Sequence, residues 1–309
     1  MMEDVGKNIQ QMMDRNQLNE TYKKLIQDVL KDPDVARFIE EHREQLSPEV
    51  IERSYAKLYE FVLEKNKFET KENMLAPGHR PQLSMGHQQI HVVYTPTREL
   101  IQKQKEAKIK SRVRSMNIPK DVREATFEKV ELTAERQVAV QKAYEFVENY
   151  LQSPKSFHKG MYLQGPFGVG KTFLLGAIAY ELAENGFPST MMHFPSFAVE
   201  MKQAISNNNT GEILEAVKRA PILMLDDIGA DSMSSWIRDD VLGVVLQYRM
   251  QEQLPTFFSS NFSMHQLETE HLRVTQRGED EPLKAKRLME RIRYLADEIV
   301  VNGENRRNQ

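Results

Sequence analysis

The chain has 309 residues, of which 40% are hydrophobic and 28% charged, an ordinary composition for a globular protein. Its 42 Lys and Arg residues against 45 Asp and Glu residues leave a net charge of −3, so any nucleic-acid contact must come from a local patch. The absence of cysteine excludes disulfides, cysteine nucleophiles and thiolate metal sites. No apolar run is long enough to cross a membrane, and we expect a cytoplasmic protein of two domains.

The first hundred residues predict helices followed by a small β element. Apolar residues recur at nearly the helical period in Leu18–Asp32, and Ser47 followed by Pro48 is typical of a helix start. Gln82–Thr95 then alternates weakly around Met85-Gly86, which favours a β-hairpin. The apolar helix faces fit either the core of a helical bundle or a surface that binds a partner.

Three histidines, His79, His87 and His91, lie in or beside the predicted hairpin. A structural zinc site usually needs four cysteine or histidine ligands, and this chain has no cysteine to complete one. We therefore expect solvated or packed histidines and no zinc site.

A basic stretch, Lys103–Arg123, carries eight Lys and Arg residues against Glu106 and Asp121. Two interpretations fit it: a solvated linker helix that runs on from Arg98, or a salt-sensitive contact with a phosphate backbone. Pro119 disfavours helix at the residue before it and marks the end of the linker. We therefore predict a helical domain with its linker helix over residues 1–114 and a second domain over residues 115–309.

Strands and helices alternate in the second domain, which predicts an α/β fold with a mostly parallel sheet. The five predicted strands are Met161–Gln164, Thr190–Phe194, Ile222–Leu225, Thr256–Ser259 and Glu298–Val301.

A phosphate-binding loop follows the first of these strands and precedes a helix, as the motif G-x-x-x-x-G-K-[ST] requires. Its residues are Gly165, Pro166, Phe167, Gly168, Val169, Gly170, Lys171 and Thr172. The glycines let backbone N–H groups turn towards an anion, and the helix start adds positive potential. Lys171 is expected to reach the β- and γ-phosphates of ATP, and the Thr172 hydroxyl to bind Mg²⁺.

Two carboxylates and an amide end the next strands of the predicted sheet. Asp226 follows a buried strand and is expected to hold the Mg²⁺ shell, while Asp227 is placed to orient or deprotonate the attacking water. Asn261 ends another strand, where it either holds the water or the γ-phosphate or is a simple turn residue. Arg291 lies on a basic helix, Lys284–Tyr294, and an arginine there is either solvated or stabilises charge at a neighbouring subunit's γ-phosphate.

Five segments together resemble the DnaI/DnaC family of bacterial primosomal helicase loaders. They are Gly165–Thr172, Leu223–Gly229, Trp236–Asp239, Pro255–Phe262 and Leu288–Arg291. The resemblance covers about residues 117–307, and the helical first domain is similar in layout. It implies an AAA+ fold with strand order 5-1-4-3-2. It also implies an ATPase that delivers the hexameric replicative helicase onto single-stranded DNA during primosome assembly.

The resemblance also assigns roles to individual residues. It implies Walker A (Lys171, Thr172), Walker B (Asp226, Asp227), sensor 1 (Asn261), an arginine finger (Arg291), sensor 2 (Arg306, with Arg307 as the rival) and single-strand contacts (Ser234, Trp236). Packing on the following helix is the alternative for Trp236. The first domain is expected to bind the helicase. ATP or helicase is expected to drive self-association, and other primosome proteins are candidate partners.

The sequence departs from the family pattern at two places. Asp227 stands where the family often has Glu, so we expect slow hydrolysis that DNA or a partner stimulates. The zinc-binding cysteines common in the family's first domain are absent, so core packing alone should hold that domain together. Two other functions stay open: a transposition-helper ATPase of the IstB type that acts on duplex DNA, and a nucleotide-gated adaptor with little turnover.

Overall fold

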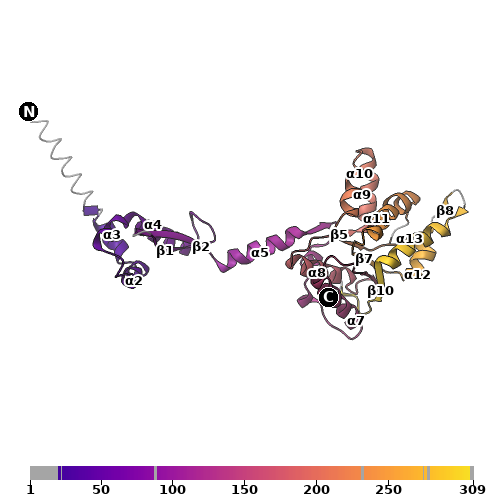
Figure 1. The fold of residues 1–309 in the computed structure, drawn as a ribbon, viewed down its shortest axis with the longest axis horizontal. Coiled ribbons are helices and arrows are strands. Elements are labelled where there is room, and N and C mark those ends of the chain that lie inside the picture. Colours follow the sequence, from indigo (N-terminus) through magenta and orange to yellow (C-terminus); the bar gives the residue numbers. More distant parts are fainter. Residues whose placement is uncertain are drawn as a thin grey trace, which may run out of the picture. The chain divides into compact units, whose positions relative to one another are not determined.

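The computed structural model describes residues 20–306 except 22, 87–88, 231–232, 274 and 277–278, with only the backbone described at 275–276 and 279–280. The chain divides into two compact units, Met1–Lys105 and Glu106–Gln309. The division falls within helix α5 (Arg98–Arg112), earlier than the expected division after residue 114 (Figure 1). It does so because strand β3 (Val113–Met116) pairs with the sheet of the second unit.

The first unit is a helical layer packed on a β-hairpin, as predicted. Its elements are helical residues 23–30, α2 (Pro33–Glu41), α3 (Pro48–Arg53), α4 (Tyr55–Thr70), β1 (His79–Gly86) and β2 (Gln89–Pro96). Strands β1 and β2 are antiparallel. One small core holds the unit together, made of Val29, Val35, Phe38, Leu46, Leu58, Phe61 and Ile90.

Polar side chains fix where these helices begin and end. The Ser47 hydroxyl accepts a hydrogen bond from the backbone N–H of Val50 and so caps α3, as predicted. Buried Ser54 separates α3 from α4. Its hydroxyl donates to the Val50 carbonyl at 2.7 Å and accepts from the Ile90 N–H at 3.2 Å, which ties the helices to the hairpin.

The histidines of the hairpin lie close to backbone carbonyls. Nδ1 of His79 is 3.2 Å from the Pro77 oxygen, and Nε2 of His91 is 3.2 Å from the Gly86 oxygen. His87 lies outside the described residues. Within the described part of the chain, no three His, Asp or Glu side chains gather in a group that could hold a metal ion.

The second unit is built on one parallel sheet of six strands in the order β10-β4-β7-β6-β5-β3. Besides β3, the strands are β4 (Gly160–Gln164), β5 (Ser189–His193), β6 (Ile222–Asp226), β7 (Thr256–Ser260) and β10 (Ala296–Val300). All five predicted strands are present in the order 5-1-4-3-2. The predicted number of five is wrong, because β3 adds a sixth at the edge. Its four residues lie in the basic stretch, which hid the strand pattern.

Both faces of this sheet are covered by helices, so successive strand residues alternate between two cores. Tyr162 packs in one core and Leu163 in the other, and Phe258 and Phe257 alternate in the same way. In Figure 1, α9 and α11 lie on one side of the sheet, and α7 and α8 lie on the other. A sheet buried in this way exposes its functional residues only at the strand ends.

The remaining elements of the second unit connect the strands. They are α6 (Lys120–Arg123), η1 (Phe127–Lys129), α7 (Gln137–Gln152), α8 (Lys171–Glu184), α9 (Phe194–Ser206), α10 (Thr210–Lys218), the π-helical turn η2 (Ile237–Leu242), α11 (Gly243–Gln251), α12 (Met264–Gln266), the π-helical turn η3 (Leu267–His271), β8 (Thr275–Gln276), β9 (Glu279–Asp280) and α13 (Pro282–Leu295). Of the helices described in either unit, none has the length and apolar character needed to cross a membrane.

Candidate functional site

A cavity of about 580 Å³ lies at the carboxyl ends of the central strands of the second unit. The predicted loop follows β4, Asp226 ends β6, and Asn261 follows β7, which lies between them in the sheet. In a parallel sheet the carboxyl ends of the strands meet at one edge, where ligands bind. The sheet therefore brings together the predicted loop, both acidic residues and the amide.

The loop has the backbone that an anion site requires. Gly168 and Gly170 have φ values of +79° and +90°, which residues with a Cβ rarely adopt. A Cβ on Gly168 would lie 2.0 Å from Oδ1 of Asn305, so this position also needs glycine for space. Helix α8 begins at Lys171 directly after the loop, so its first N–H groups have no partner within the helix.

Lys171 is held over the loop with its side chain almost fully buried. Its Nζ donates to the carbonyls of Gly165 at 2.7 Å and Pro166 at 2.8 Å and to Oδ1 of Asn261 at 2.8 Å. The ammonium charge is therefore fixed between the loop and the end of β7 before any ligand binds.

A hydroxyl and a carboxylate meet beside Lys171. The Thr172 hydroxyl donates to Oδ1 of Asp226 at 2.8 Å, and the Ser259 hydroxyl donates to the same oxygen. Burial and the neighbouring charge of Asp227 raise the pKa of Asp226, although these two hydrogen bonds oppose the rise. Thr172 and Asp226 offer hard oxygen atoms, which is the donor set that Mg²⁺ takes beside nucleotide phosphates.

Asp227 lies at the mouth of the cavity in a strained conformation with φ of +61°. Its N–H donates to the Ser259 hydroxyl at 2.9 Å, and Nδ2 of Asn261 donates to its Oδ1 at 3.1 Å. Nε2 of His193 is 3.8 Å from its other carboxylate oxygen. These contacts fix a half-exposed carboxylate next to Asp226 and Lys171.

Two arginines also line this cavity. The backbone N–H of Arg306 donates to the Gly168 carbonyl at 3.1 Å, and its guanidinium pairs with the Glu131 carboxylate at 2.6 Å. Its rival Arg307 lies outside the described residues. Sequence reasoning missed Arg136, a buried side chain in the same cavity. A lone arginine in a polar segment before a helix gave no motif to find.

Comparisons with known proteins agree with this geometry. Residues 2–94 match the family described as "Primosomal protein DnaI N-terminus", and residues 81–309 match "IstB-like ATP binding protein". The chain is 42% identical over 315 aligned residues to the replicative helicase loader DnaI of Bacillus subtilis (strain 168), covering 99% of this chain and all of the relative. The chain belongs to the DnaI family.

One solved structure and one shorter relative were also found to be similar to this chain. The match to a crystal structure of a DnaI covers 65% of this chain and all of the DnaI chain in that structure. The two are 42% identical over the match, and the TM-score is 0.54. A relative from Pseudomonas fluorescens, described as "Insertion sequence IS1162 putative ATP-binding protein", is 28% identical, but over only 27% of this chain and 36% of its own. The second unit thus carries the AAA+ ATP-binding fold of DnaI proteins.

Arg291 does not line the cavity of about 580 Å³ around Lys171, which we call the nucleotide cavity. It lies on α13 and lines a separate cavity of about 510 Å³ together with Arg287 and Lys284. Its guanidinium donates to the Gly243 carbonyl at 2.9 Å, and burial together with the Arg287 charge lowers the pKa of Arg291. Within one chain, this arginine and the predicted ATP site are therefore distinct places.

The two predicted DNA-contacting residues have structural contacts in this chain. The Ser234 hydroxyl accepts a hydrogen bond from the Ile237 N–H at 3.3 Å, at the start of a helical turn. Trp236 is half-buried and packs against the core between the sheet and α11 and α13. Trp236 therefore packs within the protein, as the alternative interpretation expects. Contact of Ser234 and Trp236 with DNA stays a prediction.

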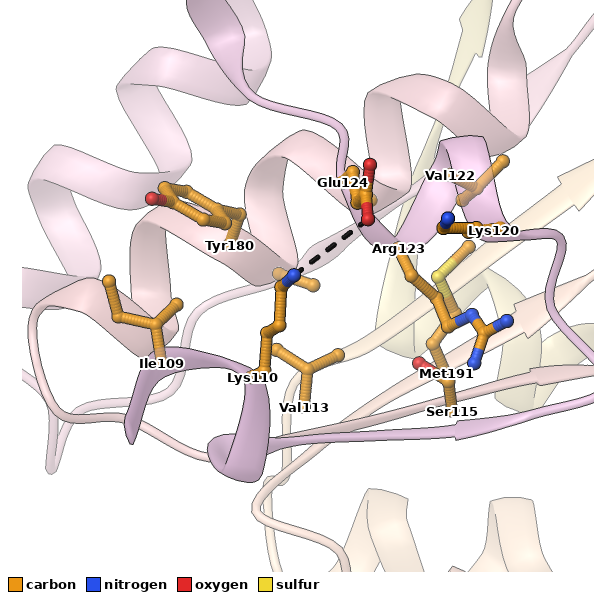
Figure 2. Close-up of a pocket in the computed structure, with 12 residues that line it drawn as sticks. Ile109, Lys110, Val113, Ser115, Lys120, Val122, Arg123, Glu124, Tyr180 and Met191 are labelled. Atoms are coloured by element: carbon orange, nitrogen blue, oxygen red, sulfur yellow. Dashed lines mark ion pairs between the residues drawn. The ribbon is translucent and has the colours of Figure 1, made fainter. Parts of the chain in front are cut away.

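The basic stretch also lines a cavity of its own, of about 370 Å³ (Figure 2). Lys110, Lys120 and Arg123 border it over an apolar floor, and Nζ of Lys110 is 3.7 Å from the Glu124 carboxylate. Val122 lines both this cavity and the nucleotide cavity, so the two cavities lie on either side of α6. The later half of the stretch is therefore folded structure and not a solvated linker.

Proposed function

We propose that this protein is an ATP-dependent loader that delivers the hexameric replicative helicase onto single-stranded DNA during primosome assembly. The observation that carries the proposal is the 42% identity to a replicative helicase loader along essentially the whole of both chains. The IstB-type transposition helper is less well supported, because the first unit matches the DnaI N-terminal family and the insertion-sequence relative covers only 27% of the chain.

The cavity suggests how the ATPase works. The loop N–H groups, Lys171 and Arg306 hold the phosphates of ATP. Thr172 and Asp226 would hold Mg²⁺, which would supply positive charge to offset that of the phosphates. Asp227, positioned by Asn261, orients the attacking water and accepts its proton. Because Asp227 is one methylene shorter than Glu, its carboxylate sits further from the phosphates, and we expect slow turnover that DNA or a partner stimulates.

The two units have different roles in this proposal, and the match of residues 2–94 to the DnaI N-terminal family supports the role of the first. The first unit is the helicase-binding part, and the second grips single-stranded DNA when ATP brings several chains together. Arg291 then completes the ATP site of a neighbouring chain, since it does not reach its own. Other primosome proteins are further candidate partners.

A pull-down with the cognate replicative helicase tests the loader. The bait is either the intact protein or a fragment of residues 1–112 that keeps α5 whole, with and without ATP. We expect both baits to capture the helicase. If the intact protein captures none under either condition, the loader proposal fails, and transposases and duplex DNA become the partners to test.

Turnover measurements separate the loader from a nucleotide-gated adaptor. We expect ATP hydrolysis that is slow alone and faster with single-stranded DNA or helicase. Helicase binding with no hydrolysis under any of these conditions would favour the adaptor.

A further inference from the structure

Arg136 is a buried cation that no part of the proposed mechanism uses. It directly precedes α7, its side chain is 2% exposed, and it lines the nucleotide cavity. Nη1 donates to the Glu131 carbonyl at 2.9 Å, whereas the buried Nε has no hydrogen-bond partner among the described residues. A buried guanidinium with so few acceptors is unfavourable unless something else compensates its charge.

The other deeply buried arginines of the described chain show what full compensation looks like. Arg238 pairs with the carboxylates of Asp239 and Glu281. Arg249 donates to three backbone carbonyls and to the Thr256 hydroxyl. Both therefore serve the fold itself, and Arg136 differs from them in having a single neutral acceptor.

The charges around Arg136 make its position still less favourable for the fold alone. The carboxylate of Glu131 attracts Arg136 but pairs with Arg306, so it compensates the Arg136 charge only in part. Burial, together with the repulsion from Arg306, lowers the pKa of Arg136. Two guanidinium groups thus share one carboxylate at the edge of a cavity that is built to receive phosphates.

The Arg136 side chain reaches the phosphate-binding loop. A Cβ placed on Gly170 would lie 2.7 Å from Nη2 of Arg136, so this nitrogen lies against the last residue of the loop before Lys171. Nζ of Lys171 is bound instead to Gly165, Pro166 and Asn261, next to the acidic residues. The two cations therefore contact different ends of the loop.

We infer that Arg136 binds the phosphate chain of the nucleotide directly, at the end away from the γ-phosphate. The inference rests on the proposed ATP-binding function and adds a second cation to that site. A phosphate beside Gly170 would offer charge-assisted hydrogen-bond acceptors to Nη2, the Arg136 nitrogen that lies against the loop. Because ADP and ATP share this part of the phosphate chain, Arg136 should strengthen the binding of both nucleotides equally.

The test compares Arg136→Met and Arg136→Lys with the unaltered full-length protein. Affinities for ADP and for ATP, each with Mg²⁺, are measured by calorimetric titration, and thermal unfolding is followed without nucleotide. The matched control is Arg219→Met, directly after the end of α10, at an exposed arginine that pairs with Glu215.

We expect Arg136→Met to weaken ADP and ATP binding by the same factor, about tenfold to a hundredfold, as the loss of a charged hydrogen-bonding partner predicts. The melting temperature without nucleotide should stay unchanged or rise, because the variant removes an under-compensated buried charge. Arg136→Lys should restore part of the affinity, and the control variant should bind both nucleotides normally.

Two results would overturn the inference. One is normal nucleotide affinity in Arg136→Met. The other is weakened affinity accompanied by a melting temperature that falls without nucleotide, which is the pattern of a structural residue. If the unaltered protein itself binds neither ADP nor ATP, the proposed function fails, which is a different outcome and is read from that arm alone.

Discussion

Asp226 is a buried carboxylate whose pKa is raised by its burial in the fold. Two hydroxyls, from α8 and β7, donate to a single oxygen, Oδ1, and the side chain is 4% exposed. The nearby Lys171 ammonium donates to Asn261 and to loop carbonyls. A buried carboxylate of this kind lowers the unfolding free energy of the nucleotide-free protein. The same charge favours the binding of a divalent cation, so we expect Asp226 to reduce stability while it enables binding.

The variant Asp226→Asn tests whether this carboxylate lowers stability and is needed for binding. The asparagine Oδ1 can still accept both hydroxyl hydrogen bonds, while the buried charge is removed. At pH 7 we expect the nucleotide-free variant to be as stable as the unaltered protein or more stable by about 1 kcal/mol, measured by urea unfolding. Stabilisation by Mg²⁺ and ATP should disappear. Loss of more than about 2 kcal/mol without nucleotide would contradict this account.

The pH dependence of the same variant has a defined sign. Because the pKa of Asp226 is raised in the folded protein above its value of 3.8, protonation favours the folded state. The destabilising effect of the charge is full above the folded pKa and fades as pH falls towards 3.8. The stability difference between Asp226→Asn and the unaltered protein should therefore shrink on acidification.

At the scale of elements, helix α4 shows how the first unit is held together. The helix ends at Thr70, where Lys71 takes φ of +58°, and the chain then returns to β1. Buried Glu64 accepts the Leu75 N–H at 2.9 Å and Lys67 Nζ at 2.7 Å. One carboxylate therefore fastens the returning segment to the helix, in addition to the core packing that the sequence predicts.

The variant Glu64→Gln should weaken the contact between α4 and the segment that returns to β1. The Lys67 hydrogen bond, followed by the Leu75 N–H, lowers the pKa of Glu64 in the folded protein. The contact therefore stabilises the fold above the unfolded value of 4.5 and is lost as pH falls through the folded pKa. At pH 7 the variant should lose about 1–2 kcal/mol of unfolding free energy, and the difference should vanish at low pH.

Denaturant unfolding of the 1–112 fragment at several pH values measures this effect. Comparing the variant with the unaltered fragment cancels the titration of all other groups. Glu40→Gln, at an exposed position paired loosely with Arg43 at 3.7 Å, is the control and should change little. A pH-independent difference for Glu64→Gln would show that shape rather than charge matters there.

The elements also show what the sequence could and could not predict. Central strands such as β6 were found because a fully buried strand is a continuous apolar run between breaks. The edge strand β3 was missed, because one side of it is open and its Arg114 and Ser115 are polar. The loop and Asp226 carry motifs, whereas Arg136 reaches the site only through the fold. Contacts between distant segments left no local pattern to read.

Strand β3 gives an element-scale prediction. A fragment of residues 106–309 should be more stable than one of residues 117–309, by about 2 kcal/mol or more, because the shorter one leaves the edge of β5 unpaired and uncovers Met191, which is 1% exposed. Urea unfolding of both fragments measures the difference. Equal stabilities would show that β3 pairs without contributing to the fold.

At the scale of the whole molecule, we predict that each chain supplies two halves of a composite site. The nucleotide cavity contains Lys171 and the acidic residues, while Arg291 lines another cavity on α13 with Arg287 and Lys284. Under the proposed function, Arg291 serves the nucleotide of a neighbouring chain. Head-to-tail contact between identical chains would place the Arg291 face of one against the nucleotide cavity of the next.

Mixing two inactive variants tests this arrangement. Arg291→Ala keeps an intact nucleotide cavity, and Lys171→Ala keeps an intact Arg291, so we expect each alone to hydrolyse little ATP. In an equal mixture, about a quarter of neighbouring pairs join an intact cavity to an intact arginine, so turnover should recover towards about a quarter of the normal rate. Arg287→Ala, one turn earlier on the same helix, is the control for loss of charge and should keep most activity. If size-exclusion chromatography shows mixed assemblies and turnover still does not recover, Arg291 acts within its own chain or only on the fold.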